Sequence, residues 1–169
     1  MKGDLHTLKK VCLYASKAML IGEAVLGLII ILTLSMGVGA LVSDTLAGHL
    51  SDWVEFLGAG SSDGFAVAEV LLILALGLIT VNFVRKLMNS IHDEYSPFTA
   101  ENVESLKHVS VIYLVSSVLL AALELLTNGN ISGAVFMFLG SMLISVVMYC
   151  LALVFRYGGV LQKESDETL

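Results

Sequence analysis

Four long stretches of almost uninterrupted apolar residues constrain the fold of this 169-residue chain more than any other feature. They cover residues 18–42, 65–84, 109–127 and 131–155. A helix needs about 20 mostly apolar residues to cross the hydrocarbon core of a bilayer, because each residue adds about 1.5 Å. A spanning segment must also satisfy its backbone hydrogen bonds internally, and the single proline of the chain leaves long helices uninterrupted. We therefore predict an all-α integral membrane protein, a single domain built as a four-helix bundle.

All nine Lys and Arg residues fall on one side of this four-helix arrangement. In order, they are Lys2, Lys9, Lys10 and Lys17 before the first span, Arg85, Lys86 and Lys107 between the second and third spans, and Arg156 and Lys163 after the fourth. Basic residues beside spans are retained on the cytoplasmic side of a membrane. We predict a multi-pass protein of the cell membrane, in contact with the lipid bilayer, with both termini and a tail over residues 156–169 in the cytoplasm.

The outer connection between the first two spans has a helical pattern of its own. Its apolar residues Leu46, Leu50, Trp53 and Leu57 recur at helical spacing between polar ones. We predict a short amphipathic helix over residues 45–57. Because Trp prefers the headgroup region, this helix is expected to lie along the outer membrane interface. A helix that caps the mouth of the bundle is the alternative.

The inner connection between the second and third spans contains the sharpest local signal. Pro97 keeps the residue before it out of a helix, and Thr99 can cap a new helix with Glu101 in its first turn. Phe98 and Val103 have the spacing of a hydrophobic staple around that cap. The sequence therefore predicts that a helix begins directly after Thr99.

These signals extend two of the helices beyond the membrane. The third helix is expected to cover residues 100–127, of which 109–127 lie in the membrane. The second span, 65–84, can continue into the cytoplasm to about residue 94. We expect these two extensions to project together as a short hairpin.

The motif of the inner connection resembles a known family of small four-helix membrane proteins from bacteria and archaea, domain of unknown function 2975. The resemblance depends on Pro97-Phe98-Thr99, Glu101-Asn102-Val103 and Leu106, and on Leu153, Phe155, Gly158, Leu161 and the ending Asp166-Glu167-Thr168-Leu169. Members usually have a more basic stretch after the Glu-Asn pair, where this chain has Lys107 and His108. The family has no established enzymatic activity, and its members are often encoded beside small helix-turn-helix regulators. The resemblance thus implies a membrane sensor, or a protein that sequesters a cytoplasmic regulator.

Three glutamates lie inside the predicted spans, where an ionised side chain costs about 2.5–3.5 kcal/mol on insertion scales. Glu69 and Glu124 are both close to the outer end of their span, so they share a similar depth. If both face the bundle interior, the two carboxylates repel unless a proton or a cation is bound, which makes them a candidate site. The alternative is that each reaches the outer headgroups or accepts a hydrogen bond from another helix.

The third glutamate, Glu23, lies in the inner half of the first span. Asn82 lies toward the inner side of the second span and is its expected hydrogen-bond partner. A glutamate that is protonated or bonded between helices is one interpretation, and a switch or relay is the other. Together with the outer pair, these two residues complete the predicted proton, cation or ligand site.

A docking surface for a cytoplasmic partner is predicted at the inner helix ends. Its candidate residues are Tyr95, Pro97, Phe98, Glu101 and Asn102 at the hairpin, and Glu164, Asp166 and Glu167 in the tail. We expect Gly158 and Gly159 to stop the fourth helix, so that the tail forms an acidic strip. Such a strip attracts a basic DNA-binding regulator. A solvated tail and a structural turn are the alternative.

The sequence contains none of the common catalytic or nucleotide-binding motifs for which we searched. The sequence has no nucleotide-binding glycine loop, no HExxH and no GxSxG, and its four histidines have no paired spacing. We predict no catalytic centre, no metal and no cofactor, and no direct binding of nucleic acid, because a basic patch for phosphates is missing.

The expected function is therefore that of a non-enzymatic regulatory or signalling protein. It would sense an envelope condition and bind a cytoplasmic helix-turn-helix regulator. The alternative is a small transporter or channel subunit that uses the intramembrane glutamates and works as an oligomer. Small residues at helical spacing, such as Ser117 and Ala121, suit packing within the bundle or a homo-oligomer.

Overall fold

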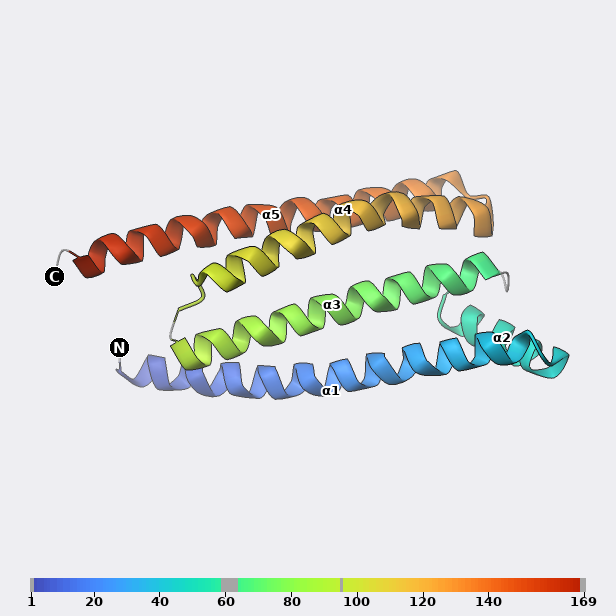
Figure 1. Ribbon diagram of the computed structural model, residues 1–169, viewed down its shortest axis with the longest axis horizontal. Helices are drawn as coiled ribbons and strands as arrows, with labels where there is room; N and C mark the ends of the chain where they lie inside the picture. Colours follow the sequence, from blue (N-terminus) through green and yellow to red (C-terminus); the bar gives the residue numbers. More distant parts are fainter. Residues whose placement is uncertain (1, 59–63, 95, 168–169) are drawn as a thin grey trace. The chain divides into compact units, whose positions relative to one another are not determined.

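The computed structural model describes the backbone of residues 2–58, 64–94 and 96–167, and the side chains of these residues except 2–6, 8, 94 and 166. Within these ranges the chain is all helical, as predicted, and has no strand. The helices are α1 (Lys2–Ala40), α2 (Asp44–Phe56), α3 (Gly64–Glu94), α4 (Ala100–Asn128) and α5 (Ile131–Glu167) (Figure 1).

Four of these helices are long and apolar enough to cross a membrane. Their outer surfaces carry many large apolar side chains, among them Leu28, Val118 and Phe136, which are 58%, 61% and 76% exposed. Water would disfavour so much apolar surface, whereas lipid does not. The protein is therefore a multi-pass membrane protein, in agreement with the prediction from the apolar stretches.

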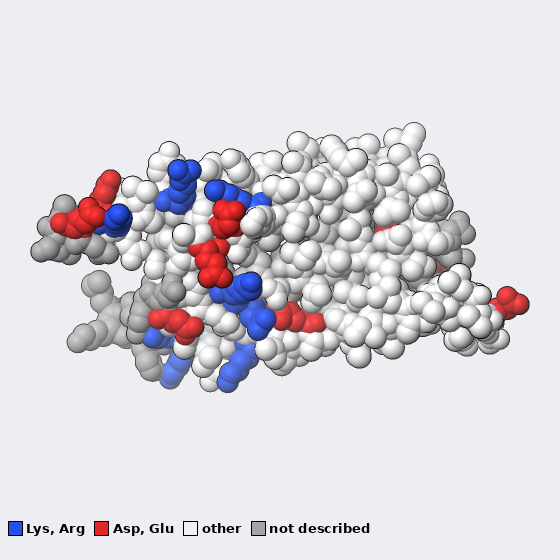
Figure 2. Space-filling model, in the orientation of Figure 1, with Lys and Arg blue, Asp and Glu red and all other residues white. Residues whose placement is uncertain are grey.

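The chain divides into two compact units, and every long helix contributes to both. Unit 1 contains Met1–Glu23, Ile79–Ile112 and Ile144–Leu169, and unit 2 contains Ala24–Leu78 and Tyr113–Leu143. All nine Lys and Arg residues belong to unit 1 and none to unit 2. Figure 2 accordingly shows the basic side chains over the unit 1 parts of the helices.

In unit 2, the short helix α2 packs against its two neighbours in sequence, α1 and α3. Leu50 and Val54 of α2 are buried in a cluster with Ala66 and Val70 of α3. The Trp53 indole Nε1 donates a hydrogen bond of 3.0 Å to the Thr33 hydroxyl of α1, and Thr33 is fully buried. One face of α2 is thus fixed to the long helices.

In unit 1, α5 continues well beyond its membrane span, so the predicted helix stop at Gly158 and Gly159 is wrong. A Cβ atom on Gly158 would lie 2.7 Å from the ring of Phe98, and one on Gly159 would lie 3.0 Å from the Phe98 carbonyl oxygen. These glycines therefore remain helical and make room for Phe98, two residues before α4. The tail predicted from residue 156 onward is helical through Glu167.

Candidate functional site

Two carboxyl groups meet in unit 2, at the beginning of α3 and the end of α4. Glu69 of α3 is 4% exposed and Glu124 of α4 is 8% exposed, so both side chains are buried. The two carboxyl groups lie close enough together to interact with each other. The structure thus brings together the two glutamates that the sequence places at the same depth.

The surroundings of this pair hold Glu124 firmly. Its Oε2 accepts a hydrogen bond of 2.9 Å from the Asn128 side-chain amide, one turn later on α4. The carboxyl group also lies against Gly133 of α5, where a Cβ atom would be only 3.0 Å from Glu124 Cδ. Gly133 therefore leaves the space that the buried carboxyl group occupies.

Glu69 is less well satisfied than its neighbour. Its Oε2 is buried and, in the described part of the chain, has no hydrogen-bond partner. The Thr127 hydroxyl is also buried and lies near the Glu69 carboxyl group. A buried polar atom without a partner is costly, so these oxygens favour a bound proton or a small cation.

The polar side chains at this place offer oxygen atoms as ligands. No group of three or more His, Cys, Asp and Glu side chains comes together within the residues whose side chains are described. Two carboxyl groups and a hydroxyl are oxygen ligands, which suit a proton or a hard cation.

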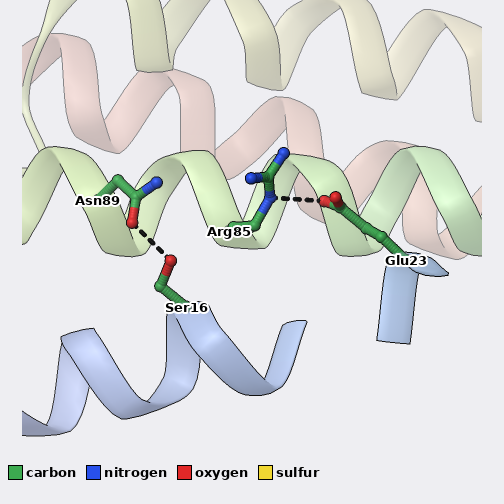
Figure 3. A network of polar contacts seen from close by, with 4 residues as sticks. All are labelled: Ser16, Glu23, Arg85 and Asn89. Atoms are coloured by element: carbon green, nitrogen blue, oxygen red, sulfur yellow. Dashed lines mark hydrogen bonds and ion pairs between the residues drawn. The ribbon is translucent and has the colours of Figure 1, made fainter. Parts of the chain in front are cut away.

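The third intramembrane glutamate belongs to a separate polar network in unit 1, between α1 and α3 (Figure 3). Arg85 Nε donates a hydrogen bond of 2.8 Å to Glu23 Oε1, and the two form an ion pair. The expected bond between Glu23 and Asn82 is therefore wrong. Arg85 follows Asn82 by three residues, so it lies on nearly the same side of α3 and its longer side chain brings the charge that Glu23 needs.

A second contact continues this network toward the helix ends. The Ser16 hydroxyl of α1 donates a hydrogen bond to Asn89 Oδ1 of α3 (Figure 3). Sequence reasoning missed both Arg85 and Asn89. A signal was available, because Ser16 and Glu23 are two turns apart and Arg85 and Asn89 are one turn apart, so each pair lies on one helix face.

The inner connection caps α4 as its sequence predicts. The Asn102 backbone N–H donates a hydrogen bond of 3.2 Å to Thr99 Oγ1, and α4 begins at Ala100. The Asn102 side-chain amide donates to the Pro97 carbonyl oxygen and to the Ser90 hydroxyl, each at 3.0 Å. Asn102, a candidate docking residue, is therefore buried and joins α3 to the connection.

The same connection also packs on α5. The Phe98 ring makes an edge-to-face contact with Phe155, with ring centroids 5.6 Å apart. The Ser96 hydroxyl donates a hydrogen bond of 2.8 Å to Gln162 Oε1. Phe98 is 37% exposed, so part of its ring remains accessible beside these contacts.

The other candidate docking residues lie on exposed helix positions. Glu101 is exposed and lines a polar pocket of about 320 Å³ between α3 and α4. Glu164 and Glu167 are exposed on α5, and Glu167 Oε1 lies 3.8 Å from the Lys163 ammonium group. Tyr95 and the side chain of Asp166 lie outside the described residues.

Comparison with known proteins adds a family and no function. No curated protein and no solved structure matches the chain. Residues 53–169, from the outer helix to the end of the chain, match the family model described as "Protein of unknown function (DUF2975)". This match covers well over half of the sequence, and the chain therefore belongs to that family, as the residues around the α4 cap and in α5 predict.

Proposed function

We propose that this protein is a non-enzymatic membrane regulator that senses a condition outside the cell membrane. The sensing group is the carboxyl pair of Glu69 and Glu124, and the responding surface is formed by the cytoplasmic ends of α3, α4 and α5. One observation carries the proposal: two buried carboxyl groups lie close together and have no Lys or Arg in their unit.

The pair suits sensing because its stability depends on an occupant that comes from outside. Two adjacent carboxylates in a membrane interior repel each other and have lost their hydration. A proton or a cation bound between them removes both penalties, and its occupancy follows the conditions at the outer surface. Because the pair joins α3 to α4 and touches α5 at Gly133, occupancy changes the packing of three helices.

The orientation in this proposal follows from the distribution of basic residues. Every Lys and Arg belongs to unit 1, which contains both chain ends, and basic residues are retained in the cytoplasm. The carboxyl pair, which has no Lys or Arg in its own unit, is then on the outer side of the membrane. On the surface of the same unit, Phe56 of α2 is 79% exposed and apolar, which supports a position of α2 along the outer interface.

This orientation predicts the result of cysteine labelling. In a variant without Cys12 and Cys150, a cysteine at Asn130, between α4 and α5, should react with an impermeant thiol reagent added to intact cells. A cysteine at Ser165, near the end of α5, should react only after the cells are opened, because the reagent cannot cross the membrane. The reverse labelling pattern would place the carboxyl pair on the inner side.

The cytoplasmic partner in this proposal is a basic, DNA-binding regulator. The exposed carboxylates Glu101, Glu164 and Glu167 provide the complementary charge, and Pro97 and the accessible edge of Phe98 provide an apolar contact. Because the connection around Phe98 packs on α5 through Phe155, a change in helix packing reaches this surface directly.

The contacts of Glu23 favour regulation over transport. A transporter needs intramembrane polar residues that can bind and release a substrate along a path. Glu23 is instead neutralised by Arg85 at 2.8 Å, which supports a structural role for this pair. The Glu69–Glu124 pair then acts as a binding site for a proton or a cation, and not as one step of a transport path.

Trp53 offers a direct test, because it is the only tryptophan of the chain and its helix packs against α3 beside Glu69. When the outer pH is lowered from about 8 to about 5, the Trp53 emission of the reconstituted protein should change with a single midpoint. The Glu69→Gln/Glu124→Gln variant should lose this change, because amides do not titrate.

The control for this measurement is Asp44→Asn, which neutralises an exposed carboxylate of the same unit. It should keep the wild-type titration. An unchanged midpoint in the Glu69→Gln/Glu124→Gln variant would show that the response arises elsewhere. In the same liposomes, a proton flux that the double variant abolishes would favour the transporter.

A further inference from the structure

A groove between the beginning of α4 and the end of α5 collects positive charge within unit 1. It has a volume of about 410 Å³ and is lined by three basic side chains, Lys107, Arg156 and Lys163. Glu104 is the only acidic residue among its described lining residues. The groove is thus an anion-attracting surface, and Phe98 is the one lining residue that the proposed regulatory function also uses.

The two helices face each other in matched register along this groove. Arg156, Val160 and Lys163 recur at one-turn spacing on α5, and Ala100, Glu104 and Lys107 do so on α4. Because Ala100 opens α4, the groove also includes a helix N-terminus. The N–H groups and the dipole of such an end favour an anion, and phosphate is commonly bound there.

The glycines of α5 make this arrangement possible. Gly159 lines the groove, and a Cβ atom there would lie 3.0 Å from the Phe98 carbonyl oxygen. The backbone that precedes α4 therefore approaches α5 closely, and the helix N-terminus reaches the basic residues of α5.

The positive charge of the groove is only weakly compensated within the protein. Lys107 Nζ lies 3.9 Å from Glu104 Oε2, and Lys163 Nζ lies 3.8 Å from Glu167 Oε1, each on the same helix and exposed. Exposed pairs of this kind contribute little free energy, so an incoming anion can replace them. Arg156 has no ion pair among the described side chains.

The position of the groove indicates where its anion comes from. Lys107 comes just before the apolar part of α4, and Arg156 comes just after the apolar part of α5, so both lie at the level of lipid headgroups. An adjoining cavity of about 280 Å³ shares Arg156 and Val160 and is also lined by Leu153 and Tyr157. A phospholipid fits both spaces, with its phosphate in the groove and an acyl chain beside Leu153.

We propose that this groove binds the phosphate of an anionic phospholipid, with Arg156 and Lys163 of α5 and Lys107 of α4 as its ligands. Basic pockets between membrane helices recognise such headgroups by charge. The site is distinct from the Glu69–Glu124 pair, which belongs to unit 2, so either proposal can fail without the other.

The test uses the purified full-length protein in detergent and dioleoylphosphatidylglycerol as the probe, with bound lipid counted by native mass spectrometry. Arg156→Gln/Lys163→Gln should weaken binding by about 30-fold at low salt, because each basic residue near anionic lipid contributes about 1 kcal/mol. Arg156→Lys keeps the charge and should retain most of the binding.

The matched control is Lys10→Gln/Lys17→Gln, which removes two exposed lysines from α1 outside the groove. It should bind the lipid as the wild type does. Equal losses in both double variants, or no loss in either, would overturn the site. If glycerol 3-phosphate at equal concentration displaces the lipid completely, the ligand is a free phosphate compound, and the lipid assignment is wrong.

Discussion

Replacing Arg85 by alanine is expected to lower the free energy of unfolding by about 3 kcal/mol, the largest effect we predict for a single substitution. The change leaves the Glu23 carboxylate without its partner, at a side-chain exposure of only 16% and on a helix that is long and apolar enough to cross a membrane. An unpaired charge in such a place must be protonated or must draw water into the protein. Unfolding of the detergent-solubilised protein, followed by circular dichroism, measures the loss.

Two further variants separate the ion pair from general effects of charge. Lys86→Ala removes the neighbouring exposed basic residue and should change stability by less than about 0.5 kcal/mol. Glu23→Gln/Arg85→Gln removes both charges and should recover most of the stability that Arg85→Ala loses. If Arg85→Ala and Lys86→Ala have the same effect, the contact between Glu23 and Arg85 does not stabilise the protein.

The sequence predicts the helices of this protein well, because lipid imposes a simple rule on them. An apolar stretch of sufficient length must be helical, and local capping residues set some of the ends. The predicted third helix, residues 100–127, is α4 (Ala100–Asn128), since Thr99 provides a cap that depends only on neighbouring residues.

Hydropathy shows which residues can lie in the membrane, but a helix can extend beyond them. The ends of the predicted spans therefore differ from the ends of the observed helices. The first span is predicted from residue 18, whereas α1 begins at Lys2, and α5 continues past residue 155 to Glu167. The polar extensions remain helical because a helix once started elongates readily in water. Gly158 and Gly159 would favour the end of an isolated helix. In this protein they lie inside α5, because Phe98 packs against them.

The sequence predicts a contact between two helices only where the contact depends on nothing but the depth of the two residues in the membrane. The similar depths of Glu69 and Glu124 follow from counting residues to the ends of their spans, and the structure shows the two carboxyl groups in contact. The partner of Glu23 depends also on the rotation of α3 about its axis and on side-chain length. Asn82 and Arg85 lie on nearly the same side, and only the structure shows that Arg85 makes the bond.

Gly158 should have the opposite response to alanine from an ordinary helical glycine. Alanine in place of an exposed helical glycine stabilises a helix by about 0.5–1 kcal/mol. At Gly158 the new Cβ atom would lie 2.7 Å from the Phe98 ring, which already packs edge-to-face on Phe155. We expect Gly158→Ala to destabilise the protein by about 1–3 kcal/mol, because the ring must leave its position.

A glycine of the same helix and the ring itself provide the controls for this prediction. A Cβ atom on Gly140 of α5 would have no neighbouring atom within 4 Å, so Gly140→Ala should be neutral or stabilising. Phe98→Ala removes the obstacle, and adding Gly158→Ala to it should then cost nothing further. The single variants Gly158→Ala and Phe98→Ala and their double mutant form a thermodynamic cycle whose coupling energy is expected to be about 1–3 kcal/mol. Additive effects in that cycle would mean that Gly158 does not serve the contact with Phe98, and that the connection before α4 is held to α5 by other residues, such as Ser96 and Gln162.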